Sequence, residues 1–367
     1  MRICSPQLGI SPKSILGGEV FDREILLGLA KRGVKVEVIL PKNKPHDKKV
    51  KNWSISYLPI SRFPAFLGNF LIIPNLFKIY KRTEFEILRI HQPQYLGLGC
   101  LLFKIFHPEV KLVATYHQFR ETKFTLFSEK INILWDHIIC DSHHVKHKLV
   151  QTYQIEPSKI TVVHNGAPSY LKPTVKDKKL VKQFKLENKT VLLFMGLFVD
   201  RKNPFFLIDV LSNLSRTKPD IVLILWGEGP LKSQIVQKAK KLKVEDKIRI
   251  VDPIFGSEKN KMHNLADIFV HPSVDEGFAL APLEAMACAK PVVMTGGYSA
   301  QEAVGNGING FLCHSNDLDQ WSNKISKLAG DPKLRIRMGK SSLIKVKKEF
   351  QWQLAVNTHH RVFQNLI

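Results

Sequence analysis

The 367 residues predict an α/β protein built from two doubly wound parallel sheets. Residues 2–40 read as one β-α-β unit, short apolar segments then alternate with helical patterns, and a Pro- and Lys-rich stretch near the middle separates two such series. Alternation of this kind is typical of a parallel sheet with helices on both faces. The length also exceeds that of one typical domain, so two Rossmann-like domains are expected.

The first series begins with Arg2-Ile-Cys, followed by the glycine-bearing loop Ser14-Ile-Leu-Gly-Gly18 and a helical pattern over residues 20–32. Gly33 stands where a helix C-cap is expected, and the β-branched residues 34–40 suit a buried parallel strand. Further strands are predicted at residues 87–90, 111–115, 137–140 and 160–163.

The second series follows a linker predicted between residues 167 and 190, with strands expected at 191–195, 221–226, 248–251, 266–270 and 291–294. We therefore predict an N-terminal domain over 1–170 and a C-terminal domain over 185–349. Residues 350–367 are expected to form a helix that packs back on the first domain. Ligands of such sheets bind beyond the C-terminal strand ends, which predicts a binding cleft.

The composition is that of an ordinary globular protein except for its charge, with 55 Lys and Arg against 32 Asp and Glu. A net charge of +23 favours nucleic acid, anionic lipid or an acidic glycan as a partner, although a solvated lysine surface explains it equally well. Neither a signal peptide nor a long apolar span is evident, so a cytoplasmic protein is expected. Five widely spaced cysteines predict buried, reduced thiols.

The segment Glu276-Gly-Phe-Ala-Leu-Ala-Pro-Leu-Glu284 places two carboxylates around a loop that opens a helix. Pro282 suits the first helical position, which would put Glu284 in the first turn. The free N–H groups of Leu280 and Ala281 would form a docking point for a diphosphate, with two carboxylates beside it to accept hydrogen bonds from sugar hydroxyls. Taken alone, the segment could equally be an acidic loop.

Several ordered motifs resemble family 4 of the retaining glycosyltransferases, which have the GT-B fold, over residues 1 to about 355. The two glutamates resemble the E-x7-E signature of that family. They are preceded by Ala266-Asp-Ile-Phe-Val-His-Pro-Ser273 and followed by Ala285-Met-Ala-Cys-Ala-Lys-Pro-Val-Val293, Thr295-Gly-Gly-Tyr-Ser-Ala-Gln-Glu302 and Asn306-Gly-Ile-Asn-Gly-Phe-Leu312.

The resemblance implies a nucleotide-sugar site in the C-terminal domain. Glu284 would bind the ribose and Glu276 the hydroxyls of the transferred sugar. The backbone of Phe278, Ala279, Leu280 and Ala281 would hold sugar and phosphates; Ala279 stands where many members have glycine, and this departure bears on donor choice.

Lys202, in Gly196-Leu-Phe-Val-Asp-Arg-Lys-Asn203, matches the family lysine that contacts the diphosphate, where a cation stabilises the leaving group. Gly196 belongs to the same donor loop. Leu197 departs from the family, because many members have arginine there as a second phosphate cation. Arg201 is the candidate to replace that charge.

In the N-terminal domain, Gly17 and Gly18 resemble the glycine loop that approaches the diphosphate, where a Cβ would not fit. His117, in Val113-Ala-Thr-Tyr-His-Gln118, matches a family histidine near the sugar and the β-phosphate. His91, in Arg89-Ile-His-Gln-Pro93, ends the neighbouring strand and is expected to face the acceptor.

The resemblance implies no protein nucleophile, no cofactor and no metal, because retaining members are thought to use front-face attack assisted by the leaving phosphate. Three other patterns are discounted. Asp317-Leu-Asp319 reads as a helix cap rather than a metal motif, Gly227-Glu-Gly229 is an incomplete dinucleotide fingerprint, and His143-His-Val-Lys-His147 lacks further zinc ligands.

The apolar segment 62–82 ends in Lys78, Lys81 and Arg82, so it reads equally well as a membrane-interface helix or as a Pro-broken core helix. The leading hypothesis is a retaining hexosyltransferase, acting from a UDP- or GDP-sugar on a cell-envelope glycan or lipid-linked acceptor, peripheral on the membrane. The alternatives are a same-fold phosphorylase or epimerase, and a non-catalytic polyanion-binding protein. No nucleic-acid motif is present, and nucleic acid is not an expected partner.

Overall fold

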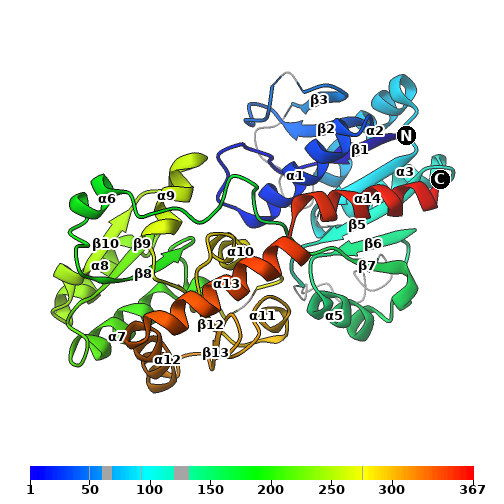
Figure 1. Cartoon of the computed structure of the whole chain (residues 1–367). Helices are drawn as coiled ribbons and strands as arrows, with labels where there is room; N and C mark the ends of the chain where they lie inside the picture. The colour runs from blue at the N-terminus through cyan, green and yellow to red at the C-terminus, as the bar shows by residue number, and fades with distance from the viewer. Residues whose placement is uncertain (49, 60–67, 92, 120–131, 275) are drawn as a thin grey trace. The chain divides into compact units, whose positions relative to one another are not determined.

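The chain forms two compact units, each a parallel sheet flanked by helices (Figure 1). The computed structural model describes residues 1–367 except 49, 60–67, 92, 120–131 and 275. The first unit comprises residues 1–165 and 352–367, and the second comprises residues 166–351. The prediction of an α/β protein with two doubly wound sheets is confirmed.

The first unit contains a seven-stranded sheet in the order β3-β2-β1-β4-β5-β6-β7, with parallel pairing throughout. Its strands are β1 (Arg2–Pro6), β2 (Lys35–Pro41), β3 (Trp53–Leu58), β4 (Ile87–His91), β5 (Lys111–Tyr116), β6 (His137–Cys140) and β7 (Ile160–Val162). Its helices are α1 (Gly17–Lys31), α2 (Gly68–Thr83), α3 (Pro93–Phe106), α5 (His143–Tyr153) and α14 (Trp352–Leu366).

The strand order reverses between β1 and β4, which are neighbours in the first sheet. Such a switch point leaves an opening at the C-terminal strand ends, where α/β proteins bind ligands. His91 is the last residue of β4, and His117 directly follows β5. Both predicted histidines therefore lie at this edge.

The second unit contains a six-stranded sheet in the order β10-β9-β8-β11-β12-β13, also parallel. Its strands are β8 (Thr190–Met195), β9 (Ile221–Trp226), β10 (Ile248–Val251), β11 (Ile268–His271), β12 (Val292–Thr295) and β13 (Gly310–Cys313). Its helices are α6 (Lys178–Gln183), α7 (Pro204–Ser215), α8 (Lys232–Lys241), α9 (Ser257–Leu265), α10 (Leu280–Ala287), α11 (Tyr298–Ala303), α12 (Leu318–Gly330) and α13 (Pro332–Glu349).

The switch point of the second sheet lies between β8 and β11. Gly196 directly follows β8, and Glu276 lies five residues beyond the end of β11, so the predicted donor residues gather at one edge of this sheet. Three aspartates cap helices of this unit: Asp177, Asp317 and Asp331 each accept a hydrogen bond from a first-turn backbone N–H. The interpretation of Asp317 as a cap is confirmed.

The last helix, α14, packs against α1 in the first unit, where Figure 1 draws them in red and blue side by side. Ala355, Val356 and Phe363 from α14 join a buried cluster with residues of α1 and the sheet. Gly28 of α1 marks the closest approach, because a Cβ at that position would lie 2.3 Å from Val356 Cγ2. The helix thus completes the core of the unit that contains the first residues.

Strands β3 and β13 are not among the predicted strands, and two helices also differ from the sequence-based expectations. Helix α10 begins at Leu280 rather than at Pro282, because Ala279 is already the extended N-cap; a proline at the third position is tolerated since its missing N–H would have no intrahelical partner. Helix α2 continues through Pro74, and its residues Ile72, Leu76 and Ile79 are buried in a core cluster. The described part of the 62–82 segment therefore packs in the core, while residues 60–67 lie outside the described residues.

All five cysteines are buried thiols that form no disulfide, as predicted. Among the described residues, none of the helices combines the length and hydropathy that a membrane span requires.

Candidate functional site

Glu276 lies beyond β11 at the centre of a cluster of cations in the second unit. Its Oε1 pairs with Lys202 Nζ and accepts a hydrogen bond from Ser273 Oγ at 2.6 Å, while Arg201 Nη1 lies 3.5 Å from Oε2. The buried His271 places Nε2 3.5 Å from Oε1. Burial alone would raise the pKa of Glu276, but the Lys202 charge and the contact with His271 together outweigh this effect and hold the pKa well below its usual range. The carboxylate is therefore ionised at neutral pH.

Lys202 and Arg201 come from the short 3-10 helix Asp200–Lys202 in the loop after β8. This loop is tied to the loop after β11, because the N–H of Val274 donates to the backbone oxygen of Arg201 at 3.0 Å, and Ser273 Oγ lies at the same distance from that oxygen. The tie fixes the two cations beside Glu276. Arg201 supplies a second positive charge in the cluster, four residues after the half-buried Leu197.

Gly227 and Gly229 must be glycine because their backbone lies directly against the backbone of Gly196 and Phe198. A Cβ at Gly227, where φ is +155°, would lie 1.9 Å from the carbonyl oxygen of Gly196. At Gly229, where φ is +150°, it would lie 2.5 Å from the carbonyl oxygen of Phe198. The Gly227-Glu-Gly229 motif thus has a structural role in bringing β9 and the loop after β8 together.

Glu284, on α10, is held by a second lysine and a second histidine. Lys259 Nζ lies 2.6 Å from Oε1, and Nε2 of the fully buried His263 lies 3.6 Å from Oε2. Burial would raise the pKa of Glu284, but the Lys259 charge and the contact with His263 together outweigh this effect and lower the pKa to about 2. Lys259 also lies over the ring of Trp226, 5.5 Å from its centroid. Each predicted glutamate is therefore an ionised acceptor with its own fixed partners.

Between the glutamates, the start of α10 offers backbone donors. Phe278 is buried with its ring 5.5 Å from that of Phe350, which anchors the loop. Ala279 is the N-cap, and Leu280 and Ala281 are the first two helical residues, whose N–H groups have no intrahelical acceptor. These groups and the helix dipole make a site suited to an anion.

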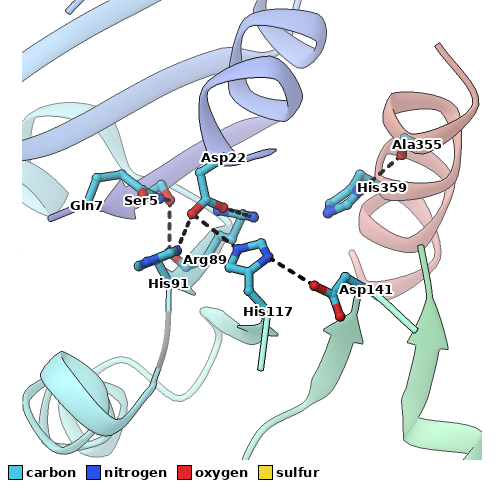
Figure 2. A network of polar contacts seen from close by, with 9 residues as sticks. All are labelled: Ser5, Gln7, Asp22, Arg89, His91, His117, Asp141, Ala355 and His359. Atoms are coloured by element: carbon cyan, nitrogen blue, oxygen red, sulfur yellow. Dashed lines mark hydrogen bonds and ion pairs between the residues drawn. The ribbon is translucent and has the colours of Figure 1, made fainter. Parts of the chain in front are cut away.

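In the first unit, the two predicted histidines meet at a buried aspartate (Figure 2). His91 Nδ1 pairs directly with Asp22 Oδ2, and His117 Nε2 lies 3.4 Å from the same oxygen. Arg89 Nη2 pairs with the other oxygen, Oδ1. A Cβ on Gly18 would lie 3.4 Å from both His117 Cδ2 and His91 Cε1, so this glycine packs against the two rings.

Burial lowers the pKa of His117, although the Asp22 charge partly opposes the shift. Burial would raise the pKa of Asp22, but Arg89, which has the strongest lowering effect, together with His91 and His117 holds the pKa well below its ordinary value. On the far side of His117, Nδ1 lies 3.9 Å from Asp141 Oδ2. The arrangement is a charge-balanced Asp22–Arg89 pair with the rings of His91 and His117 beside it.

The structure therefore brings the predicted residues together in two sets. Lys202, Arg201 and Glu276 share one cluster in the second unit, with Gly196, Phe278, Ala279, Leu280, Ala281 and Glu284 at the same edge of its sheet. In the first unit Gly18, His91 and His117 are in contact, and Gly17 is exposed at the first position of α1.

Sequence reasoning missed the partners that hold these groups: Asp22, Arg89, Lys259, His263, His271 and Ser273. Two of these partners could have been recognised from their spacing in the sequence. Lys259 and His263 stand four residues apart on α9, a spacing that places both side chains on one helix face.

Two family descriptions match the chain. "Glycosyltransferase Family 4" matches residues 15–169 and "Glycosyl transferases group 1" matches residues 175–343. A D-inositol 3-phosphate glycosyltransferase from Corynebacterium glutamicum is 25% identical over 364 residues, covering 88% of this chain and 85% of that protein. A UDP-Gal:alpha-D-GlcNAc-diphosphoundecaprenol alpha-1,3-galactosyltransferase from Escherichia coli is 24% identical, covering 71% of each.

Solved structures share the fold at lower identity. Sucrose-phosphate synthase from Thermosynechococcus elongatus aligns with a TM-score of 0.84 at 18% identity, covering 100% of this chain and 98% of that one. Anabaena Alr3699/HepE in complex with UDP aligns with a TM-score of 0.82 at 19% identity, covering 100% of both. These similarities establish the two-domain GT-B fold.

Proposed function

Because this chain belongs to the family 4 glycosyltransferases, we propose that it transfers a hexose, with retention of configuration, from a UDP-sugar to a hydroxyl acceptor. The observation that carries the proposal is the ionised Glu276, fixed by two cations and Ser273 beside the start of α10. Uridine as the base is supported by the Escherichia coli relative, named for UDP-Gal, and by the Anabaena structures with UDP and UDP-glucose.

The second unit would hold the donor. The Glu276 carboxylate would accept hydrogen bonds from hydroxyls of the transferred sugar, and Glu284 would accept them from the ribose. The N–H groups at the start of α10 and the Lys202 ammonium would stabilise the diphosphate as the glycosidic bond breaks. In the structure Lys202 is paired with Glu276. Donor binding would therefore bring the sugar hydroxyls to the Glu276 carboxylate and the phosphate to the Lys202 ammonium of one existing ion pair.

The first unit would contribute His117 near the sugar and the phosphate, His91 near the acceptor, and the small residues Gly17 and Gly18 where the diphosphate approaches. Attack from the front face needs no protein nucleophile, because the leaving phosphate can take the acceptor proton. We propose that the reaction also needs no metal ion, since Lys202 and Arg201 supply positive charge at the diphosphate position.

A cell-envelope or lipid-linked saccharide is the acceptor class that we propose, on an anionic membrane surface. A basic groove of about 390 Å³ in the first unit supports this proposal. Its lining is Ser56, Tyr57, Asn75, Lys78, Ile79, Lys81 and Arg82. Cations here and the net charge of +23 would attract anionic headgroups.

Thermal protection and product analysis with UDP- and GDP-sugars test the donor proposal. We expect a UDP-sugar to raise the melting temperature, and Glu276→Ala to abolish both transfer and that shift, whereas Glu245→Ala, at an exposed carboxylate, changes neither. No protection by any nucleotide sugar would refute the proposal. Turnover with free phosphate in place of an acceptor would indicate a phosphorylase, conversion of the donor without an acceptor would indicate an epimerase, and salt-sensitive binding to polyanions without turnover would indicate a binding protein.

A further inference from the structure

Asp22 is a completely buried carboxylate to which the proposed reaction assigns no role. It projects from α1, and its two oxygens are divided between partners from β4 and from the residue that follows β5 (Figure 2). Oδ1 pairs with Arg89, a fully buried guanidinium, while Oδ2 faces His91 Nδ1 and, at 3.4 Å, His117 Nε2. Burying two charges costs several kcal/mol unless they are well paired, so a purely apolar core would be the simpler solution here.

The contacts with Asp22 determine which ring nitrogen of each histidine carries the hydrogen. An ionised carboxylate only accepts hydrogen bonds, and a neutral imidazole carries one N–H. The nitrogen that contacts Asp22 must therefore be the protonated one, which for His91 is Nδ1. His91 Nε2 is then left with a lone pair, which is free to accept a hydrogen bond because the contact with Asp22 is made by Nδ1.

We propose that Asp22 is a positioning residue that holds His91 in its Nδ1–H tautomer, so that Nε2 accepts a hydrogen bond from the acceptor hydroxyl. This inference rests on the proposed function. His91 Cε1, the ring carbon between Nδ1 and Nε2, packs 3.4 Å from where a Gly18 Cβ would stand. The His91 ring thus lies against the predicted glycine loop, at the C-terminal edge of the sheet.

The groups around the pair agree with this assignment. His117, at 3.4 Å, is the second donor to Oδ2, and Asp141 lies beyond it at 3.9 Å. His359 of α14 is buried and donates its own Nδ1–H to the carbonyl oxygen of Ala355 at 2.9 Å. Arg89 is therefore the fixed cation of the cluster, and it balances Asp22.

Asp22, His91 and His117 also offer three ligand atoms within 4.8 Å of one another, as a metal site would. A divalent cation there would stand beside the buried guanidinium of Arg89, with a single carboxylate to balance both. The charge count favours the hydrogen-bonded arrangement, and metal binding becomes one outcome of the test.

Nitrogen-15 NMR of the histidine rings tests the assignment without any substrate. Wild-type His91, identified by the loss of its signals in His91→Gln, should show a protonated Nδ1 and an unprotonated Nε2 at pH 7.5. Asp22→Asn should reverse this tautomer, because Arg89 can only donate and keeps the amide oxygen, which turns the amide NH₂ toward His91. Asp141→Asn is the control and should leave His91 unchanged.

In transfer assays, Asp22→Asn should lower kcat about tenfold or more while the Kd for UDP changes less than about twofold, because Glu284, Lys202 and the N–H groups of α10, which are proposed to hold the ribose and the diphosphate, lie in the other unit. A wild-type His91 protonated on Nε2, an Asp22→Asn enzyme with the reversed tautomer and full kcat, or stoichiometric zinc lost on Asp22→Asn would each overturn the inference. Absence of transfer by the wild type would instead count against the proposed function, since the tautomer is measured independently.

Discussion

Replacing His359 with leucine should make the protein more resistant to acid. His359 lies on α14, fully buried against Phe21 and Phe363, with ring centroids 5.6 and 6.1 Å away. Its Nδ1–H donates to the carbonyl oxygen of Ala355, whereas Nε2 is buried with no hydrogen-bond partner in the described part of the chain. Burial, reinforced by the nearby Arg89 charge, lowers the pKa of His359 from 6.5 to about 3.

The sign and size of the effect follow from this shift. Between pH 6.5 and about 3 the unfolded chain binds a proton at residue 359 that the folded chain does not, so the free energy of unfolding falls as the pH falls through this window. Each pH unit costs about 1.4 kcal/mol, which makes about 2 kcal/mol at pH 5. At pH 7.5 leucine loses one hydrogen bond but also removes an unpartnered nitrogen, so the two proteins should be nearly equal in stability.

Calorimetry of both proteins at pH 7.5 and pH 5 measures this difference. For a unit of this size, about 2 kcal/mol corresponds to a gain of about 4–8 °C in the melting temperature of the first unit, seen at pH 5 only. His360→Leu is the matched control, because it removes a neighbouring histidine of the same helix whose side chain is only half-buried. An equal stability difference at the two pH values would refute the reasoning.

Three further predictions concern single contacts. Lys202→Met should slow transfer by about a hundredfold or more. The variant protein should lose less than the roughly 3–5 kcal/mol of a broken buried ion pair, because Arg201 and Ser273 still hold Glu276. Lys240→Met, at an exposed lysine, is the control in both kinetics and calorimetry. Glu284 has a pKa of about 2 instead of 4.5, so the stability it contributes to the folded state is present above pH 4.5 and is lost as the pH falls toward 2. In Glu284→Gln, the free energy of unfolding of the second unit should therefore fall by up to about 3 kcal/mol less over this pH range. An unchanged dependence of the unfolding free energy on acid pH would contradict this prediction. Gly28→Ala should destabilise the first unit by about 1–3 kcal/mol through the clash with Val356, and Val356→Ala in the same chain should restore part of that loss, whereas additive losses in denaturant titrations would show that the two sites do not touch.

Much of the fold can be predicted from the periodicity of apolar residues and from the Gly and Pro residues that end helices and strands. The apolar β-branched runs gave the strands because a parallel strand buried on both faces has little room for polar residues. Pro282 predicts a start of α10 two residues later than the observed Leu280, because proline is tolerated throughout the first turn and does not mark its first position. Pro74 likewise did not break α2, because core contacts of the surrounding helix outweigh one lost hydrogen bond.

The candidate site was accessible only in part. Lys202, Glu276 and Glu284 could be found because a motif of fixed spacing carries them. Asp22 could not, because one aspartate on a mostly apolar helix looks like a surface position, and its partner Arg89 is 67 residues away on a strand. Long-range pairing of this kind leaves no local pattern in one sequence.

The position of α14 also has a consequence for how the protein is made. The first unit needs residues 352–367, which the ribosome adds only after the whole of residues 166–351. At ordinary elongation rates that delay is roughly 10–40 s, during which the α1 face that receives Val356, His359 and Phe363 stays uncovered. The nascent chain therefore exposes an apolar surface while its second unit is already able to fold.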